Sequence, residues 1–402
     1  MSKFHIEPCM LDSIPSKTSD LLVELTTLSQ FDKALSPGSA NSLASIVRMM
    51  NCYYSNLIEG HNTTLQDIQE AIQGEVQEAD MESADKTRNL QLEALAHIRV
   101  QEQIDKLHAN GQLPDPTSPQ FIQWLHESFY HNASESMLTI DADKGVIMVP
   151  GHFRDEGEEV LVGRHVPCQG KDVASSMGYF GERYSTSSIS RSTQIMSAAT
   201  AHHRLVYIHP FLDGNGRVAR LMSHAINLHA GVGASGLWSI SRGLARGLQS
   251  NTEYKSMLSL ADTVRQGDLD GRGNLSLKSL TDFTDWFLEV SCDQVTFMSS
   301  LFDLKSLSKR LERYVDLKEL RPESKYIVTA TLTGEIPRGD AARLTGLKER
   351  SARDVLSALV ADGIIGSGTP KGPVSLRFTL DSSRVLFPRL FEDFSDDDHA
   401  PR

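Results

Sequence analysis

Residues 209–220 of this chain read HPFLDGNGRVAR. This stretch places a histidine, a carboxylate, two glycines and two arginines within a dozen residues. Gly214 and Gly216 let backbone N–H groups turn toward an anion, and the segment after them is predicted to be a helix whose N-terminus faces the same anion. Arg217 and Arg220 share one face at the start of that helix, where the macrodipole disfavours cations. This pattern indicates a site that binds phosphate groups.

Each residue type in this stretch suits one part of phosphate chemistry. His209 titrates near neutrality, so it can take a proton from a hydroxyl nucleophile. Asp213 is placed to hold Mg²⁺, an ion that prefers hard oxygen ligands, although a lone aspartate here would otherwise be a helix cap. The other glycine and polar positions are predicted to cradle phosphate oxygens and neutralise their charge: Gly214, Asn215, Gly216, Arg217 and Arg220.

The composition is that of a soluble globular protein. A length of 402 residues predicts two or three domains. No run approaches the roughly 20 apolar residues that span a bilayer, and residues 1–15 lack a basic then apolar leader, so we predict a cytoplasmic protein with no membrane contact. The four cysteines are far apart, which predicts reduced thiols. A net charge of −12 argues against broad attraction to nucleic acid.

Helical spacing of apolar residues dominates the first 230 positions. It predicts helices at residues 21–35, 41–57, 64–72, 85–106, 121–130, 189–207 and 217–229. Residues 144–166 change to alternation with glycine punctuation, which predicts a β-hairpin. Its second arm is predicted as a short strand over residues 160–166, and Pro167 would end the pairing.

Residues 323–380 follow a different pattern. Helices are predicted at residues 324–332, 340–344 and 348–361, with helix-turn-helix spacing. Two short strands around a glycine-rich loop, residues 363–366 and 374–378, predict a β-wing. Together these elements predict a small winged-helix domain of α+β class.

The predicted third helix of that domain leaves two kinds of partner open. Lys348, Arg350 and Arg353 could face a DNA groove. Glu349 and Asp354 dilute this basic face. DNA binding is therefore not favoured, and docking of a protein or formation of a homodimer fits the acidic chain better.

At residues 209–220 the chain resembles the Fic family of protein adenylyltransferases, whose signature HPFxDGNGRxxR is matched at every fixed position. The resemblance extends over roughly residues 49–274. It implies ATP as donor, transfer of AMP to a protein Ser, Thr or Tyr hydroxyl, and release of pyrophosphate. By the same resemblance His209 is the base, Asp213 binds the metal, and the phosphate contacts come from Asn215, Gly216, Arg217 for the inner phosphates and Arg220 for the γ-phosphate.

Two further regions resemble parts of the family's nucleotide and target sites. The predicted hairpin is similar to the family's flap, which borders the nucleotide and offers a strand edge to an extended target, here at Val160, Leu161, Val162 and Gly163. Tyr254 matches an aromatic residue that lines the adenosine pocket. Asp262 departs from relatives that carry Asn at a nearby nucleotide-contacting position, so no role is assigned to it.

Ser55-Asn56-Leu57-Ile58-Glu59-Gly60 matches the family's inhibitory motif [ST]xxxE[GN], placed N-terminal to the core as in class II members. Ser55 and Glu59 share one helix face. The resemblance implies that Glu59 pairs with Arg220, takes the place of the γ-phosphate and keeps the enzyme autoinhibited. In some relatives the same glutamate positions a water that removes AMP, so a de-AMPylating or bifunctional enzyme is the alternative.

We therefore predict a mainly α protein with a Fic-fold helical core, a β-hairpin flap and a C-terminal winged-helix domain. The predicted parts are an N-terminal helical region with the inhibitory helix at 1–115, the core at 116–298, a helical linker at 299–322, the winged helix at 323–385 and an acidic tail at 386–402. The predicted ligands are ATP and Mg²⁺, and the partner is a protein with a target hydroxyl. Self-modification, transfer of UMP or another group, and a DNA-binding regulator with a Fic core stay open.

Overall fold

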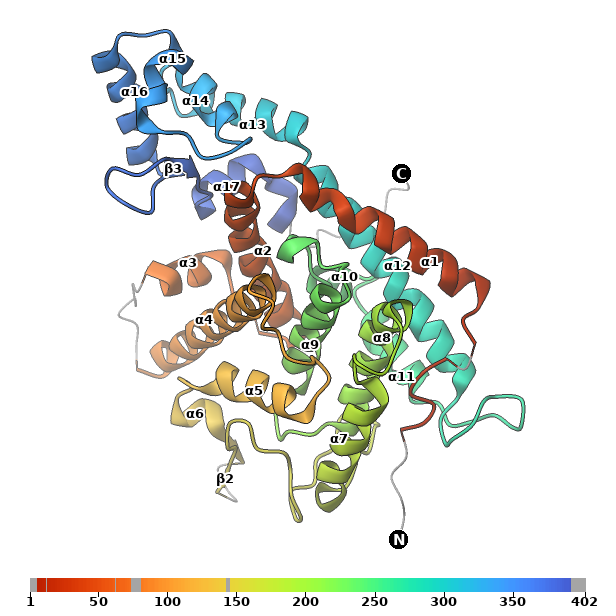
Figure 1. Cartoon of the computed structure of the whole chain (residues 1–402). Helices are drawn as coiled ribbons and strands as arrows, with labels where there is room; N and C mark the ends of the chain where they lie inside the picture. Colours follow the sequence, from red (N-terminus) through yellow and green to blue (C-terminus); the bar gives the residue numbers. More distant parts are fainter. Residues whose placement is uncertain (1–5, 12, 62, 74–80, 142–144, 392–402) are drawn as a thin grey trace. The chain divides into compact units, whose positions relative to one another are not determined.

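The computed structural model of the chain describes residues 6–11, 13–61, 63–73, 81–141 and 145–391 (Figure 1). The end of the predicted acidic tail, residues 392–402, lies outside these ranges. Contacts divide the chain into two compact units, one formed by Met1–Gln30 and Asn51–Thr296, the other by Phe31–Met50 and Phe297–Arg402. Helices make up most of both units, which confirms the predicted mainly α fold class.

The larger unit is a helical assembly with one short strand pair. The residue ranges of the two units divide α2 (Pro37–Ile58) and α12 (Leu277–Leu301). The other elements of the larger unit are α1 (Ser16–Leu28), α3 (Leu65–Gln73), α4 (Met81–Ala109), α5 (Pro119–Tyr130), α6 (Glu135–Leu138), β1 (Thr139–Asp141), β2 (Val146–Ile147), α7 (Gly170–Tyr184), α8 (Arg191–Ile208), α9 (Asn215–His229), η2 (Ala234–Gly236), α10 (Ser241–Arg246) and α11 (Glu253–Ala261).

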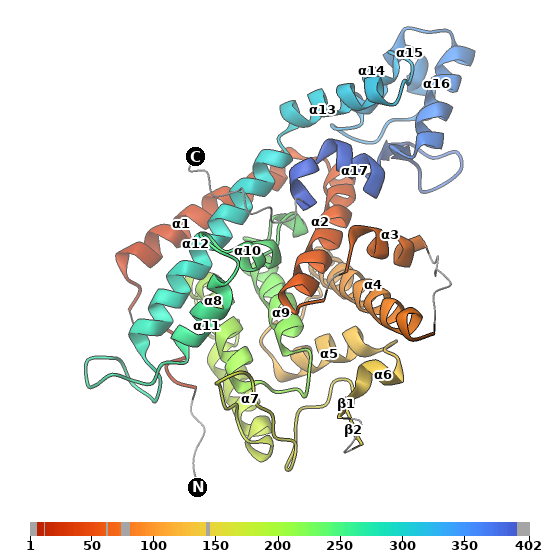
Figure 2. The same cartoon turned by 180° about the vertical axis from the view of Figure 1, so that it is seen from behind.

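Helix α9 is the centre of the larger unit. It is buried along almost its whole length, and it contacts α8, α4 and α5 (Figures 1 and 2). A helix buried on every side belongs to the core, so its position is fixed by packing and not by one amphipathic face. Because the glycine loop of residues 209–214 joins α8 to α9, the motif lies where two largely buried helices meet.

The N-terminal segment is fastened to the same helices from outside. Helix α1 lies alongside α12 in both views, and Thr18 Oγ1 donates a hydrogen bond to Asp285 Oδ1 at 2.5 Å (Figures 1 and 2). Before α1, the carbonyl of Pro8 accepts two hydrogen bonds from the buried Arg204 guanidinium on α8, at 3.1 and 2.8 Å. The chain start therefore braces the helix that ends at His209.

The predicted hairpin is displaced from its expected position. Antiparallel pairing is found between β1 and β2, with Thr139 opposite Ile147. The strand predicted over residues 160–166 is wrong, since the segment contains a single bridge between Val162 and His165. Gly163 takes a left-handed conformation with φ 59°, which reverses the chain at the middle of the expected strand.

The smaller unit contains helices and a strand pair at the positions predicted for residues 323–380. The expected helices are found as α14, α15 and α16, and Gly346 makes the turn before α16 with φ 69°. β3 pairs antiparallel with β4, with Ile365 opposite Leu376. Its elements are α13 (Leu304–Leu317), α14 (Ser324–Ala330), η3 (Arg338–Asp340), α15 (Ala341–Thr345), α16 (Glu349–Asp362), β3 (Ile365–Gly366), β4 (Ser375–Leu376), α17 (Leu380–Leu386) and η4 (Pro388–Phe391), with η1 (Ser29–Ala34) at the boundary.

Two sequence expectations concern the whole chain. All four cysteines are buried and unpaired, which agrees with the predicted reduced thiols. Among the described residues, no helix has both the length and the apolar character needed to cross a membrane.

Candidate active site

His209 ends α8 in a left-handed conformation, with φ 53°. Its backbone N–H bonds the Leu205 carbonyl, and its own carbonyl accepts from Arg154 Nε at 2.8 Å. Such backbone geometry in a residue other than glycine is held in place by its surroundings. Burial, followed by the nearby Arg154 charge, lowers the pKa of His209 to about 4. At pH 7 the imidazole is therefore neutral and available to accept a proton.

The loop after His209 is held by side chains that bond its backbone. Asn215 accepts from the Phe211 N–H at 2.9 Å and donates to the Phe211 carbonyl at 2.8 Å. His126 Nδ1 accepts from the Gly151 N–H at 2.8 Å, so Nε2 is the ring donor and bonds the Asp213 carbonyl at 3.2 Å. These bonds hold the loop in place without any ligand. Both polar atoms of the Asn215 side-chain amide are bonded to the Phe211 backbone.

The two glycines of the loop are close to other groups. Gly214 has φ 78°, and a Cβ there would lie 2.8 Å from the Tyr130 ring and hydroxyl. A Cβ on Gly216 would lie 2.6 Å from Glu59 Oε1 and 3.1 Å from Arg220 Nη1. Both positions therefore exclude a side chain, the first by conformation and contact and the second by contact alone.

Asp213 keeps an exposed carboxylate at the edge of the loop. Tyr130 donates to Asp213 Oδ2 at 3.1 Å, and Arg217 Nη2 lies 3.8 Å from the same oxygen. Burial opposes ionisation, but the Arg217 charge and a hydrogen bond from the Gly214 N–H together lower the pKa of Asp213. Half of the side chain, 50%, remains exposed. Asp213 is thus an ionised carboxylate that solvent can reach.

Arg217 is buried among partners from two other helices. Its Nη1 donates to Glu93 Oε1 at 3.3 Å and to the Tyr130 hydroxyl at 3.0 Å. The guanidinium also lies over the Phe129 and Tyr130 rings, 5.4 and 5.9 Å from their centres. Glu93 and Tyr130 did not appear among the predicted site residues, because nothing in their local sequence marks a partner of the distant loop.

Arg220 is bound to the end of α2. Its Nε donates to Ser55 Oγ at 2.9 Å, and its Nη2 lies 2.6 Å from Glu59 Oε1. Burial would raise the pKa of Glu59, but the Arg220 charge, then that of Arg217, lowers it. The side chain of Arg220 is 1% exposed and that of Glu59 is 29% exposed. The pair is therefore a close ion pair with its carboxylate open to one side.

That open side is a cavity of about 510 Å³. Several predicted site residues line it together: Glu59, Val162, Gly163, His209, Gly216, Arg220 and Tyr254. Asp213, Asn215 and Arg217 belong to the adjoining loop and are not among its lining residues, and neither are Val160 and Leu161. Ser55 lies behind Arg220, fully buried.

Hydrogen-bonded chains support the far wall of this cavity. Ser223 Oγ donates to backbone carbonyls, so it accepts from His202 Nδ1 at 2.9 Å, and His202 Nε2 accepts from the Tyr254 hydroxyl at 2.7 Å. Asp262, to which no role was assigned, lies 3.1 Å from His203 Nε2 and 3.7 Å from His165 Nδ1. Contacts within the chain therefore hold the Tyr254 ring and the Asp262 carboxylate in this wall.

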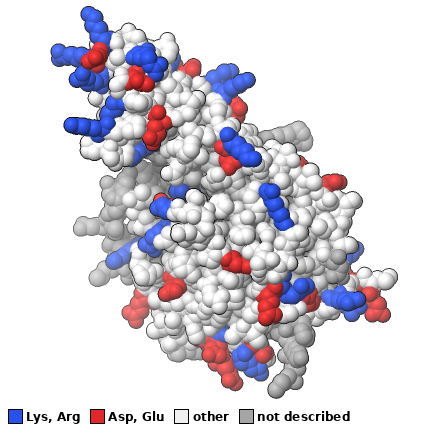
Figure 3. All heavy atoms as spheres, in the orientation of Figure 1, with Lys and Arg blue, Asp and Glu red and all other residues white. Residues whose placement is uncertain are grey.

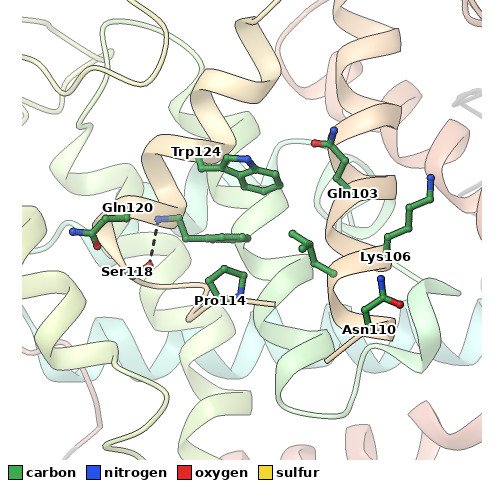
Figure 4. Close-up of a pocket in the computed structure, with 9 residues that line it drawn as sticks. Gln103, Lys106, Asn110, Pro114, Ser118, Gln120 and Trp124 are labelled. Carbon is green, nitrogen blue, oxygen red and sulfur yellow. Dashed lines mark hydrogen bonds between the residues drawn. The ribbon is translucent and has the colours of Figure 1, made fainter. Parts of the chain in front are cut away.

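A second cavity of about 510 Å³ lies between α4 and α5 (Figure 4). The rings of Phe121 and Trp124 stack on the α5 side, with centres 5.3 Å apart. Gln103 and Lys106 line it from α4, and Asn110 lines it from the turn that follows. Its described lining includes none of the predicted site residues, so it is separate from the cavity at His209.

Exposed basic side chains gather on the smaller unit over α15 and α16 (Figure 3). Several carry their own counter-charge: Arg343 lies 2.9 Å from Asp340, and Arg353 lies 3.3 Å from Glu349. The basic character of this surface is therefore partly neutralised.

Comparison with known proteins gives a family match within the larger unit. Residues 116–226 match the model of the Fic/DOC family. Two proteins called Protein adenylyltransferase Fic, from Drosophila erecta and Nematostella vectensis, are each 41% identical over 81 residues, 20% of this chain. The match spans 16% and 18% of those relatives' lengths.

A solved structure extends the likeness in fold. The crystal structure of a Fic family protein from Desulfovibrio desulfuricans G20 matches 92% of this chain and 98% of its own, with a TM-score of 0.53 and 16% identity. Taken with the family match, this likeness places the loop of residues 209–220 within a known fold. Residues 116–226 form a domain of the Fic/DOC family.

Proposed function

We propose that this chain is a nucleotidyltransferase that moves AMP from ATP to a Ser, Thr or Tyr hydroxyl of a protein, and that Glu59 holds it at low activity. The observation that carries the proposal is the arrangement at the cavity. The neutral His209 and the Arg220–Glu59 ion pair line one space, next to the glycine loop of residues 209–214. The names of the curated relatives agree with this activity.

His209 acts as the general base in the proposed reaction. The target hydroxyl oxygen attacks the α-phosphorus of ATP, and the bond from that phosphorus to the bridging oxygen breaks, so pyrophosphate leaves. His209 takes the hydroxyl proton as the new bond forms. Because burial keeps its imidazole neutral, it is ready to do so at pH 7.

The loop residues fit ATP and Mg²⁺. Asp213 offers an ionised, half-exposed carboxylate, and a single carboxylate with substrate phosphates is a common Mg²⁺ site. Among the described residues no group of three or more His, Cys, Asp or Glu side chains forms a metal centre, so the ion would rest on Asp213 and on the nucleotide. Bound Mg²⁺ would supply charge neutralisation at the phosphates. Gly214 and Gly216 leave room for phosphate oxygens, and Arg217 and Arg220 supply positive charge.

Glu59 is the proposed inhibitor. Its carboxylate forms an ion pair with the Arg220 guanidinium, with Oε1 2.6 Å from Nη2. We assign this guanidinium to the γ-phosphate. A phosphate must displace a close charge-assisted hydrogen bond to reach Arg220. Glu59 Oε1 also lies only 2.6 Å from the position that a Cβ on Gly216 would take, so it covers the start of the cradle.

Contacts with the rest of the substrates are assigned to the cavity walls. Tyr254 is proposed to line the adenosine pocket, where its ring is held by His202. The edge of residues 160–163 is proposed to meet an extended segment of the target protein, since Leu161 and Val162 are exposed. The smaller unit is proposed to be a winged-helix domain that docks a protein.

The test is transfer of label from α-labelled ATP into protein, with Mg²⁺, by the wild type, Glu59→Gly and Glu59→Gly with His209→Ala. We expect strong labelling only in Glu59→Gly, and loss of about 10²–10⁴-fold when the base is removed. Thermal unfolding of each variant controls for folding. Equal labelling by Glu59→Gly with and without His209 would contradict the mechanism, and equal labelling by wild type and Glu59→Gly would contradict the inhibition.

A further inference from the structure

The turn that carries Glu59 is fastened at a second point. His61 Nδ1 lies 2.7 Å from Glu93 Oε2 on α4. The other oxygen of the same carboxylate, Oε1, accepts from Arg217 Nη1 at 3.3 Å. Glu93 is buried, so one carboxylate joins the end of the α2 segment to the first arginine of the loop.

Residues 57–61, which we name the Glu59 turn, form a short turn held by backbone hydrogen bonds. The Gly60 N–H bonds the Leu57 carbonyl at 3.1 Å, and the His61 N–H bonds the Asn56 carbonyl at 2.9 Å. Gly60 reverses the chain with φ 80°. Because a single glycine separates Glu59 from His61, a displacement of either side chain's anchor acts on the other.

The two anchors hold the two arginines of the loop. Glu59 holds Arg220 at 2.6 Å, and Glu93 holds Arg217 while His61 holds Glu93. Both arginines are buried, with 1% and 4% of their side chains exposed, so their bonds to carboxylates are shielded from water. An incoming triphosphate therefore meets two arginines that are already paired.

We propose that His61 and Glu93 are positioning residues of the inhibited state: their contact fixes the Glu59 turn on α4 and keeps Glu59 on Arg220. The proposal rests on the AMP transfer proposed above, in which these arginines meet phosphates. Release of the His61–Glu93 contact frees the Glu59 turn and raises transfer. Neither residue touches the reacting atoms.

Electrostatics agree with this geometry. The hydrogen bond to Glu93 is the main cause that raises the pKa of His61. Burial and the Arg217 charge on α9 oppose this rise, and the Glu59 charge in the turn after α2 adds to it. The charged imidazolium therefore makes the stronger bond to Glu93. His61 is 34% exposed, so solvent can exchange its proton.

The experiment uses the full chain and two readouts. Hydrogen exchange is measured at the amides of Gly60 and Thr63, since the Thr63 N–H bonds the His61 carbonyl at 2.9 Å. Transfer is measured with α-labelled ATP and Mg²⁺. The variants are His61→Ala, which removes the donor, His61→Asn, which keeps a donor without charge, and Glu59→Gly. The matched control is His229→Ala, at an exposed histidine that ends α9.

Loss of a charge-assisted hydrogen bond of this kind predicts an increase of about tenfold in both exchange and transfer for His61→Ala. His61→Asn should recover part of both, and His229→Ala should change neither. In the double variant with Glu59→Gly, His61→Ala should add nothing to transfer, because the contact acts through Glu59. Thermal unfolding checks that each variant folds.

The outcomes separate this proposal from the activity. Wild-type exchange at Gly60 and Thr63 in His61→Ala overturns the positioning role, whatever transfer does. Faster exchange without a rise in transfer, when Glu59→Gly does transfer, overturns the link to inhibition. If Glu59→Gly transfers nothing while exchange is faster in His61→Ala, the positioning of the turn stands and the proposed AMP transfer fails.

Discussion

The loop at residues 209–220 and the segment at residues 160–166 border the same cavity but are built in opposite ways. In the loop, Asn215, Arg217 and Arg220 are 2%, 4% and 2% exposed, and each is bound by named partners. In the other segment, Leu161 is 72% exposed, and the pairing found there is one bridge between Val162 and His165. The loop is fixed before a ligand binds, whereas the segment leaves its edge and apolar side chains for a partner.

This difference matches the two tasks that we propose. Phosphoryl chemistry depends on charges held in place, because groups that need not reorganise stabilise the transition state best. Recognition of an extended target depends on unpaired backbone and exposed side chains. Variants of the loop should therefore cost stability and activity together, and variants of the segment should cost only target use.

Gly214→Ala should have the largest effect. The left-handed φ of 78° costs about 1–2 kcal/mol for a residue with a Cβ, and the new carbon would lie 2.8 Å from Tyr130. With overpacking of about 1–3 kcal/mol, the free energy of unfolding should fall by about 2–5 kcal/mol. In the Glu59→Gly background, displacement of the loop should lower transfer by about 100-fold. Denaturant unfolding and labelled-ATP transfer measure these changes.

Gly178→Ala is the matched control for that substitution. Gly178 lies within α7, and a Cβ there would meet nothing within 4 Å. Alanine is the better helix former by about 0.5–1 kcal/mol, so this variant should be slightly more stable. Equal stability of the two variants would show that the loop is not held as tightly as its contacts indicate.

The contiguity of the motif made the loop predictable from sequence. The functional side chains of residues 209–220 are close together in the sequence. His209, Asp213 and Arg217 are therefore expected to be neighbours in any fold that contains this stretch. Glu93 and Tyr130 come from distant helices, and a single sequence contains no record of such long-range packing. The strand at 160–166 was wrong because alternation of side chains does not reveal a left-handed glycine at its centre, here Gly163.

The pH dependence of transfer should show that His209 stays neutral well below pH 7. Burial lowers the pKa of His209 to about 4, so its neutral form persists as pH falls from 7 through the ordinary imidazole range. Transfer by Glu59→Gly should therefore hold to about pH 5 and fall as pH approaches 4. Initial rates of labelling across this range measure it. A midpoint near 6.5 would show an exposed imidazole instead.

Acid unfolding must be followed in the same experiment. Burial also lowers the pKa of His97 and His202 to about 3, so both are neutral in the folded protein and take up protons when it unfolds. A group with a depressed folded pKa makes the unfolded state bind more protons, so stability is lost as pH falls below the ordinary value of 6.5. Circular dichroism at each pH separates this loss from protonation of His209.

Leu161→Asp should have the smallest effect on the fold and a selective effect on function. The side chain is 72% exposed, so the free energy of unfolding should change by less than about 0.5 kcal/mol. Leu161 does not line the cavity, so ATP affinity, measured by calorimetry, should stay unchanged. Labelling of proteins in a cleared cell lysate should fall a few-fold in the Glu59→Gly background, because an extended target loses an apolar contact beside its backbone pairing. The control is Leu269→Asp, at a fully exposed leucine of the loop between α11 and α12. An equal loss with Leu269→Asp would mean that added charge, and not the segment at residues 160–166, governs target use.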